Sequence, residues 1–164
     1  MHAIGVLHVS LALAAVGTGA AVLRAEKGTR RHRRLGRIYA LAMLGLNASA
    51  LLIYRLFGRF GPFHILALVS LATLAAGVLP AWRKRPTGAW LARHYWFMTW
   101  SYVGLLAAFA AELAVRLPLV GAPGRHGPGL AFALAALVAS AVVSGIGGAL
   151  IARRRPAPLG RAGS

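Results

Sequence analysis

The stretch that decides the fold is Lys27–Leu44, KGTRRHRRLGRIYALAML. Six of its first eleven residues are lysine or arginine, His32 lies among them, and after Arg37 the stretch becomes apolar. A dense cationic run that gives way to an apolar run is typical of the point where a chain leaves the cytoplasmic face of a membrane and enters the lipid. The stretch therefore predicts a membrane protein and carries its topology signal.

The composition of the whole chain points the same way. The 164 residues are 59% hydrophobic and only 13% charged, whereas about 25% of the residues in a soluble domain are charged. Glu26 and Glu112 are the only acids, so the net charge is +17. The cations lie in short clusters without interleaved aromatic residues, which favours anionic lipid headgroups as their partner and argues against nucleic acid. The absence of cysteine excludes disulfides and thiolate chemistry.

Five apolar segments have the length of a transmembrane helix, about 20 residues. The sequence therefore predicts a single all-α integral membrane domain, a bundle of five transmembrane helices. Proline and glycine mark a loop at Leu117–Pro128, and Pro62 and Pro80 mark the start and the end of the third span. The predicted spans are Ala3–Leu23, Arg37–Tyr54, Pro62–Ala81, Trp90–Val115 and Gly129–Ala152, followed by a basic tail at 153–164.

The distribution of lysine and arginine predicts the orientation. Seven lie between the first two spans, four between the third and fourth, and four after the fifth, while only four fall on the other side. Because basic loops stay cytoplasmic, we expect the N-terminus outside and the C-terminus inside the plasma membrane. No lysine or arginine precedes the first apolar segment, so it is interpreted as an uncleaved span and not as a signal peptide.

The first four spans form a weak repeat of two helical hairpins. His8 begins HVSLALAAVGTGAAVL and His64 begins HILALVSLATLAAGVL, and each segment is followed by a basic loop and a second histidine, His32 or His94. The repeat predicts an outer histidine pair, His8 with His64, and an inner pair, His32 with His94.

Helical spacing predicts which faces of three spans are packed. Polar side chains within a span avoid lipid, so their stripes on the second and fourth spans are expected to face the bundle centre. A ridge of small residues on the fifth span is expected to pack against another helix or a membrane-protein partner. The two stripes and the ridge are His32, Gly36, Tyr39, Met43, Asn47, Ala50 and Tyr54; His94, Met98, Ser101, Leu105, Ala108 and Glu112; and Ala136, Ser140, Ser144 and Gly148.

The ordered pattern resembles the bacterial membrane-protein family known as domain of unknown function 2306. The resemblance covers roughly Val6 to Arg116 and leaves the fifth span and the basic tail outside. It implies a small helical membrane protein without a settled activity. The residues that carry it are Lys27, Gly28, Thr29 and His32; Phe63 and His64; and His94, Met98, Trp100, Ser101 and Glu112.

The first functional hypothesis is a transmembrane electron carrier that binds haem b. The layout of His8, His32, His64 and His94 resembles transmembrane di-haem b-type cytochromes, which carry ligand pairs near both faces of a four-helix core. Neutral imidazoles are good axial ligands, and interfacial arginines can pair with haem propionates. Room for the macrocycle is expected beside four glycines, namely Gly17, Gly19, Gly45 and Gly104.

Two other hypotheses stay open. One is a small proton, metal or solute transporter, since Glu112 is the only acid within a span. Arg116 follows one turn later, so the two residues are also expected to form a structural ion pair. The other is a non-catalytic membrane subunit or assembly partner. Hydrolysis is not indicated, because aspartate, cysteine, GxSxG and HExxH are all missing from the sequence.

Overall fold

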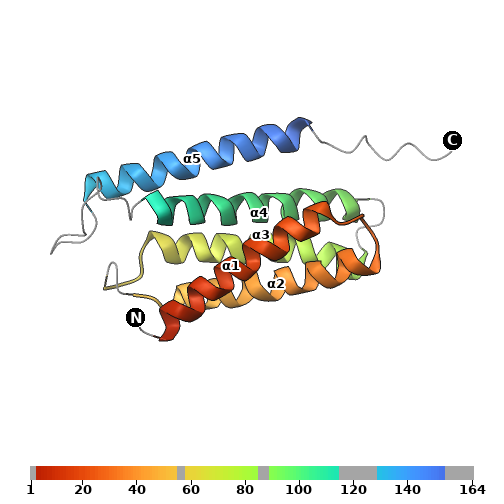
Figure 1. The fold of residues 1–164 in the computed structure, drawn as a ribbon, viewed down its shortest axis with the longest axis horizontal. Coiled ribbons are helices and arrows are strands. Elements are labelled where there is room, and N and C mark those ends of the chain that lie inside the picture. Colours follow the sequence, from red (N-terminus) through yellow and green to blue (C-terminus); the bar gives the residue numbers. More distant parts are fainter. Residues whose placement is uncertain (1–2, 55–57, 85–88, 115–128, 154–164) are drawn as a thin grey trace.

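The described residues of the protein form five helices. The computed structural model describes residues 3–54, 58–84, 89–114 and 129–153, and these residues contain no strand. Successive helices run in opposite directions, so α1 begins at one end of the molecule and α5 finishes at the other (Figure 1). The prediction of an all-α bundle is confirmed. The helices are α1 (Ala3–Arg24), α2 (Arg30–Leu51), α3 (Pro62–Arg83), α4 (Trp90–Ala114) and α5 (Leu130–Arg153).

Four of these helices, α1, α3, α4 and α5, are long and apolar enough to cross a membrane. Helix α2 has the same length as α1, 22 residues, but its first two turns are RRHRRLGR. Large apolar side chains cover the outside of the bundle, among them Leu41, Leu66 and Leu137. Such a surface suits lipid and not water.

Helices α1 to α4 form a closed ring of neighbours. Each packs against the next in sequence, and α1 also contacts α4, whereas α5 packs on the outer side of α4. Helices α2 and α4 therefore lie diagonally across the bundle and run in the same direction. The core between them contains Ala15, Tyr39, Met43, Leu46, Leu74 and Leu105.

The start of α2 differs from the prediction. The second span was predicted at Arg37–Tyr54, but the helix begins at Arg30 and ends at Leu51. Thr29 explains the early start, because its hydroxyl accepts a hydrogen bond of 3.1 Å from the backbone N–H of His32 and thereby caps the helix. Arginine is also a good helix former. His32 consequently lies in the first turn of a helix.

The prolines of α3 predicted its start but not its end. Pro62 occupies the first turn, as predicted, where its missing N–H costs nothing. Pro80 lies in the last turn, and α3 continues beyond the predicted end to Arg83. The helix stops where Lys84 adopts a left-handed φ of 50°. The predicted loop Leu117–Pro128 lies outside the described residues.

The polar stripes face the core over most of their length. Tyr39, Met43 and Asn47 of α2 and Ser101 of α4 are buried, but Glu112 at the end of the α4 stripe is exposed. A stripe spaced by alternating steps of three and four residues repeats every 3.5 residues, whereas the helix repeats every 3.6. The stripe therefore rotates away from the core toward its end.

The small-residue ridge of α5 packs within the chain. All four residues of the ridge are partly buried, namely Ala136, Ser140, Ser144 and Gly148. The Ser140 hydroxyl lies 3.5 Å from the carbonyl of Ala107 on α4. A Cβ on Gly148 would meet the Trp100 ring at 3.3 Å. The ridge is thus the surface that holds α5 against α4.

Candidate functional site

The candidate site is the meeting point of His32 and His94 at the basic end of the bundle. Their ring centres lie 6.4 Å apart and the ring planes are nearly perpendicular, at 86°. His32 comes from the first turn of α2 and His94 from the second turn of α4. The two hairpins of the repeat therefore contribute one histidine each, as predicted for the inner pair.

The Lys27-Gly28-Thr29 turn fixes the position of His32. The Lys27 ammonium donates to the carbonyls of Val22, Leu23 and Ala25 at 2.9, 2.8 and 3.1 Å, so it caps the end of α1. Gly28 has a φ of +80°, which a side chain would strain. Thr29 then caps α2. This stretch of sequence is thus a tight connection that places His32 at the inner end of the bundle.

A carbonyl of the preceding helix holds His94, and a carbonyl of α1 lies near His32. Nδ1 of His94 lies 2.8 Å from the carbonyl oxygen of Gly77 on α3. The carbonyl of Val22 on α1 lies close to the His32 ring, while Nδ1 of His32 is buried and has no partner among the described residues. The bond to Gly77 orients the His94 ring and leaves its other ring nitrogen available.

Gly77 is essential to the approach of α3 to α4. A Cβ added there would lie 2.7 Å from the Met98 sulfur and 3.1 Å from the Met98 backbone nitrogen. A side chain at this position would require Met98 to shift, whereas glycine brings the carbonyl within reach of His94 without such a shift. Sequence reasoning missed Gly77. The available signal was a glycine in the interior of an apolar helix, which often marks close helix packing.

Positive charge surrounds His32. It lies in the basic first turn of α2, before the apolar part of the helix that begins near residue 37. Burial lowers the pKa of His32 below its ordinary value, and the nearby charges of Lys27, His94 and Arg33 lower it further. The Arg33 guanidinium is itself fixed by a 2.6 Å bond to the carbonyl of Gly28. The neutral ring, which has a free lone pair, is therefore the favoured form at pH 7.

A packed polar layer separates the histidines from the rest of the core. The Tyr39 and Ser101 hydroxyls lie 3.0 Å apart, and the Tyr102 hydroxyl donates to the carbonyl of Val16 at 3.2 Å. Tyr102 and Tyr39 also fill the space beside Gly19. The layer closes the site toward the membrane centre.

The predicted outer pair is not assembled. Nδ1 of His8 lies 2.9 Å from the Ser49 hydroxyl on α2. His64 is 3% exposed, and its ring packs between Tyr54 and Phe60 with centres 4.5 and 4.9 Å away. No contact joins His8 to His64 in the described part of the chain.

The bonds at His64 leave one ring nitrogen without a partner. Its Nδ1 accepts a bond of 3.2 Å from the Gly61 N–H. Its Nε2 is buried without a partner among the described residues. His64 is therefore a packed residue near the outer end of the bundle.

Two further expectations concern Glu112 and the glycines. Arg116 lies outside the described residues, so the Glu112–Arg116 pair stays a prediction. The glycines do not provide room for a macrocycle, which corrects the expectation. Gly19 is covered by tyrosines and Gly45 by Leu11, while Gly17 and Gly104 lie on the exposed surface. The glycines serve helix packing instead, because side chains from neighbouring helices occupy the space inside the ring.

The His32 and His94 imidazoles could each supply one nitrogen to a haem iron. The 6.4 Å between their ring centres would be compatible with both binding one metal, because each metal–nitrogen bond is about 2.0 Å. The described residues contain no group of three or more His, Cys, Asp or Glu side chains that would hold a bare ion. A haem iron needs only two protein ligands.

Comparison with known proteins identifies the family. The model of a predicted membrane protein family, DUF2306, matches residues 5–151. The match extends the resemblance seen in the sequence, since it includes nearly all of α5, which was expected to lie outside. Neither a curated protein nor a solved structure matches the chain. The chain belongs to the DUF2306 family of predicted membrane proteins.

Proposed function

We propose that the protein is a membrane electron carrier that binds one b-type haem between His32 and His94. A bound haem would supply a one-electron iron couple. The observation that carries the proposal is the approach of two half-buried histidines from different hairpins to 6.4 Å. The His94 ring is anchored through Nδ1 to the Gly77 carbonyl. In metal-binding histidines, such a bond to a carbonyl fixes the tautomer and the ring orientation.

The remaining residues of the site have separate tasks in this proposal. The carbonyl of Gly77 holds the His94 ring. Lys27 and Arg33 provide positive charge for the carboxylates of the haem. The hydroxyl pair of Tyr39 and Ser101 keeps water from entering the core below the site. A single haem is proposed because His8 and His64 are engaged elsewhere.

We also propose the topology in which all five helices cross the plasma membrane. The start of α1 and the end of α5 lie at opposite ends of the bundle. The cation-rich connections lie at the same end as the candidate site, since they join α1 to α2 and α3 to α4. The positive-inside rule then places this end, and the C-terminus, in the cytoplasm.

Absorption spectroscopy tests the haem directly. The protein is produced in haem-replete cells, purified in mild detergent, and quantified as pyridine haemochrome. We expect a b-type Soret band and about one haem per chain. His32→Ala and His94→Ala are each expected to abolish it, whereas the matched controls His8→Ala and His64→Ala retain it. A colourless wild-type protein with full helicity would overturn the proposal.

A proton path is the second candidate, and one observation favours it. His64 holds a buried ring nitrogen without a partner at the outer end of the bundle, and intramembrane histidines occur in proton relays. Reconstituted vesicles with an internal pH dye separate the candidates. Proton flux that His64→Ala abolishes, in a protein without haem, would select the path over the carrier.

A further inference from the structure

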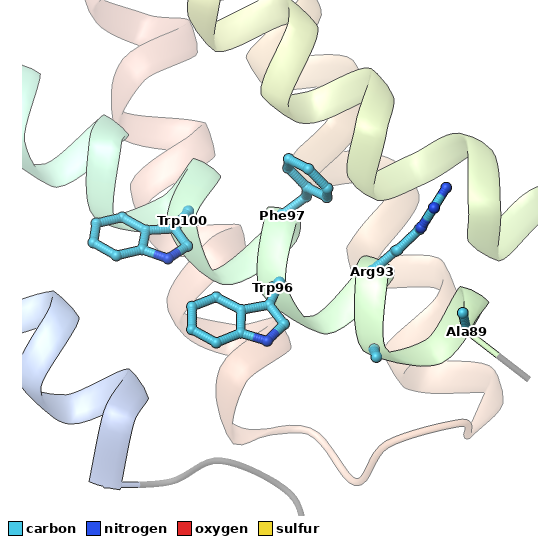
Figure 2. A pocket seen from close by; sticks show the side chains of 6 residues that line it. Ala89, Arg93, Trp96, Phe97 and Trp100 are labelled. Atoms are coloured by element: carbon cyan, nitrogen blue, oxygen red, sulfur yellow. The ribbon is translucent and has the colours of Figure 1, made fainter. Parts of the chain in front are cut away.

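Two features of the bundle lie outside the candidate site. One is an open pocket on α4 whose lining surface is apolar, and Figure 2 shows its single arginine extending toward α3, away from the tryptophan rings. Nothing polar in this pocket would select a ligand. Its lining residues are Ala89, Ala92, Arg93, Trp96, Phe97 and Trp100. The other feature is His64 at the start of α3, a buried titratable side chain with one unpaired ring nitrogen.

The hydrogen bond at Nδ1 shows which form of His64 the fold holds. The Gly61 N–H donates to this nitrogen at 3.2 Å, so Nδ1 carries a lone pair and the hydrogen of the neutral ring is on Nε2. Gly61 is the N-cap of α3 and His64 is the third residue of the helix. The side chain therefore caps its own helix, in the way that glutamate or glutamine does in a capping box.

Two aromatic rings enclose this imidazole. The ring centres of Tyr54 and Phe60 lie 4.5 and 4.9 Å from that of His64. The Gly58 N–H donates to the Tyr54 carbonyl at 2.7 Å, which closes the chain between the two rings. Among the described residues, Tyr54 is the one titratable group in contact with the ring, and a phenol carries no charge between pH 5 and pH 8. No charged side chain in the described ranges is bonded to His64.

We propose that His64 is a pH-sensitive latch, a side chain that holds the connection between α2 and α3 closed while its ring is neutral. A proton from the medium binds to Nδ1, and the new N–H then faces the N–H of Gly61, so the cap is lost. The charged ring has two N–H groups and no acceptor among the described residues, which makes its burial unfavourable. The ring therefore turns out toward water and releases Tyr54, Phe60 and the first turn of α3.

The sign of the pH dependence follows from the bonds. The closed form holds the neutral ring, whereas the open form binds a proton as an exposed histidine does, near pH 6.5. The closed form is therefore stable above this pH and loses stability as the pH falls below it. The latch depends neither on haem nor on proton flux across the membrane.

Hydrogen exchange of the purified full-length protein in detergent tests the latch. We expect the amides of residues 61–67, after correction for intrinsic rates, to exchange about tenfold faster at pH 5 than at pH 8. Residues 140–146 of α5 contain no titratable side chain and should show no such change. Equal corrected rates at both pH values in residues 61–67 would overturn the proposal.

Two variants assign the effect to His64. His64→Gln keeps an acceptor for the Gly61 N–H but does not titrate, so its corrected rates should be slow and equal at both pH values. His8→Gln removes another histidine from the same end of the bundle and should keep the tenfold difference. A difference that persists in His64→Gln, or disappears in His8→Gln, contradicts the latch. Nitrogen NMR of the wild-type ring is an independent check, and a hydrogen on Nδ1 at pH 8 would also overturn the proposal.

Discussion

The hydroxyls of Tyr39 and Ser101 meet at 3.0 Å in the buried core, although the residues are 62 positions apart in sequence. Each lies seven residues, two helical turns, after a histidine of the candidate site, since Tyr39 follows His32 and Ser101 follows His94. Helices α2 and α4 thus contact each other at two levels of the bundle, and these levels are two helical turns apart on both helices. The hydroxyl contact therefore supports the histidine contact, because any rotation or sliding of α2 against α4 would break both.

Removing the hydroxyl pair should weaken the bundle modestly. Tyr39→Phe and Ser101→Ala each delete one partner, and hydrogen bonds between transmembrane helices contribute about 0.6 kcal/mol on average and at most about 1.7 kcal/mol. We expect a small drop in the thermal stability of each variant in detergent. The double variant should be no less stable than the worse single variant, because both remove the same interaction. Additive losses would show that the two hydroxyls act independently.

Gly77→Ala should separate α3 from α4. The new methyl group would meet Met98 at 2.7 Å, so the helices must move and the Gly77 carbonyl withdraws from His94. We expect lower thermal stability and loss of any bound haem. Gly104→Ala is the control, since nothing lies within 4 Å of that position and alanine favours helix by about 1 kcal/mol over glycine. A Gly77→Ala protein as stable as Gly104→Ala would contradict the close-contact interpretation.

In the haem-free protein, low pH should destabilise the inner end of the bundle through His32. Its pKa is lower in the folded protein than in the unfolded chain, so between these two values the unfolded chain binds more protons. Stability is then fully present above the unfolded pKa, about 6.5, and decreases as the pH falls below it. Thermal melting from pH 8 to pH 5 measures this, and His32→Gln should flatten the slope in that range. An unchanged slope in His32→Gln would assign the acid sensitivity to another group.

Helix α5 should detach when its packing ridge is enlarged. A side chain at Gly147 would meet Val103 at 2.6 Å, whereas nothing lies within 4 Å of Gly145. Gly147→Leu should therefore displace α5 from α4, and Gly145→Leu should not. Cross-linking between cysteines introduced at Ala107 and Ser140, whose positions are in contact, reports the docking. Equal cross-linking in both leucine variants would show that α5 is held elsewhere.

The proposed topology can be mapped. A reporter fused after Arg153 should be active in the cytoplasm, and a tag placed before Ala3 should be accessible from outside. Replacing the arginines of residues 30–37 with glutamine should weaken or invert this result. A tag and a reporter on the same side would require an even number of spans.

The sequence by itself determined the class of protein, the number of helices and most of their limits. These properties depend on local hydropathy, on the clustering of cations and on single residues such as Pro62, each of which acts over a few turns. The early start of α2 was missed because the arginine-rich residues 30–36 were interpreted as part of a loop, although Thr29 is an ordinary helix cap. The family match also includes the fifth helix. The sequence did not show this because the uniformly apolar composition of that helix gave no distinctive pattern.

Only the tertiary structure decided which histidines meet. The repeat predicted two equivalent pairs, yet His32 approaches His94 while His8 bonds to Ser49 and His64 packs against Tyr54. The order of helices around the bundle and the rotation of each helix set these contacts, and both depend on side chains that are distant in sequence. Gly77 shows this most clearly, because its closeness to Met98 exists only once α3 and α4 are packed. Helix packing in lipid depends on such close contacts and not on hydrophobic burial, so hydropathy could predict the helices but not the site.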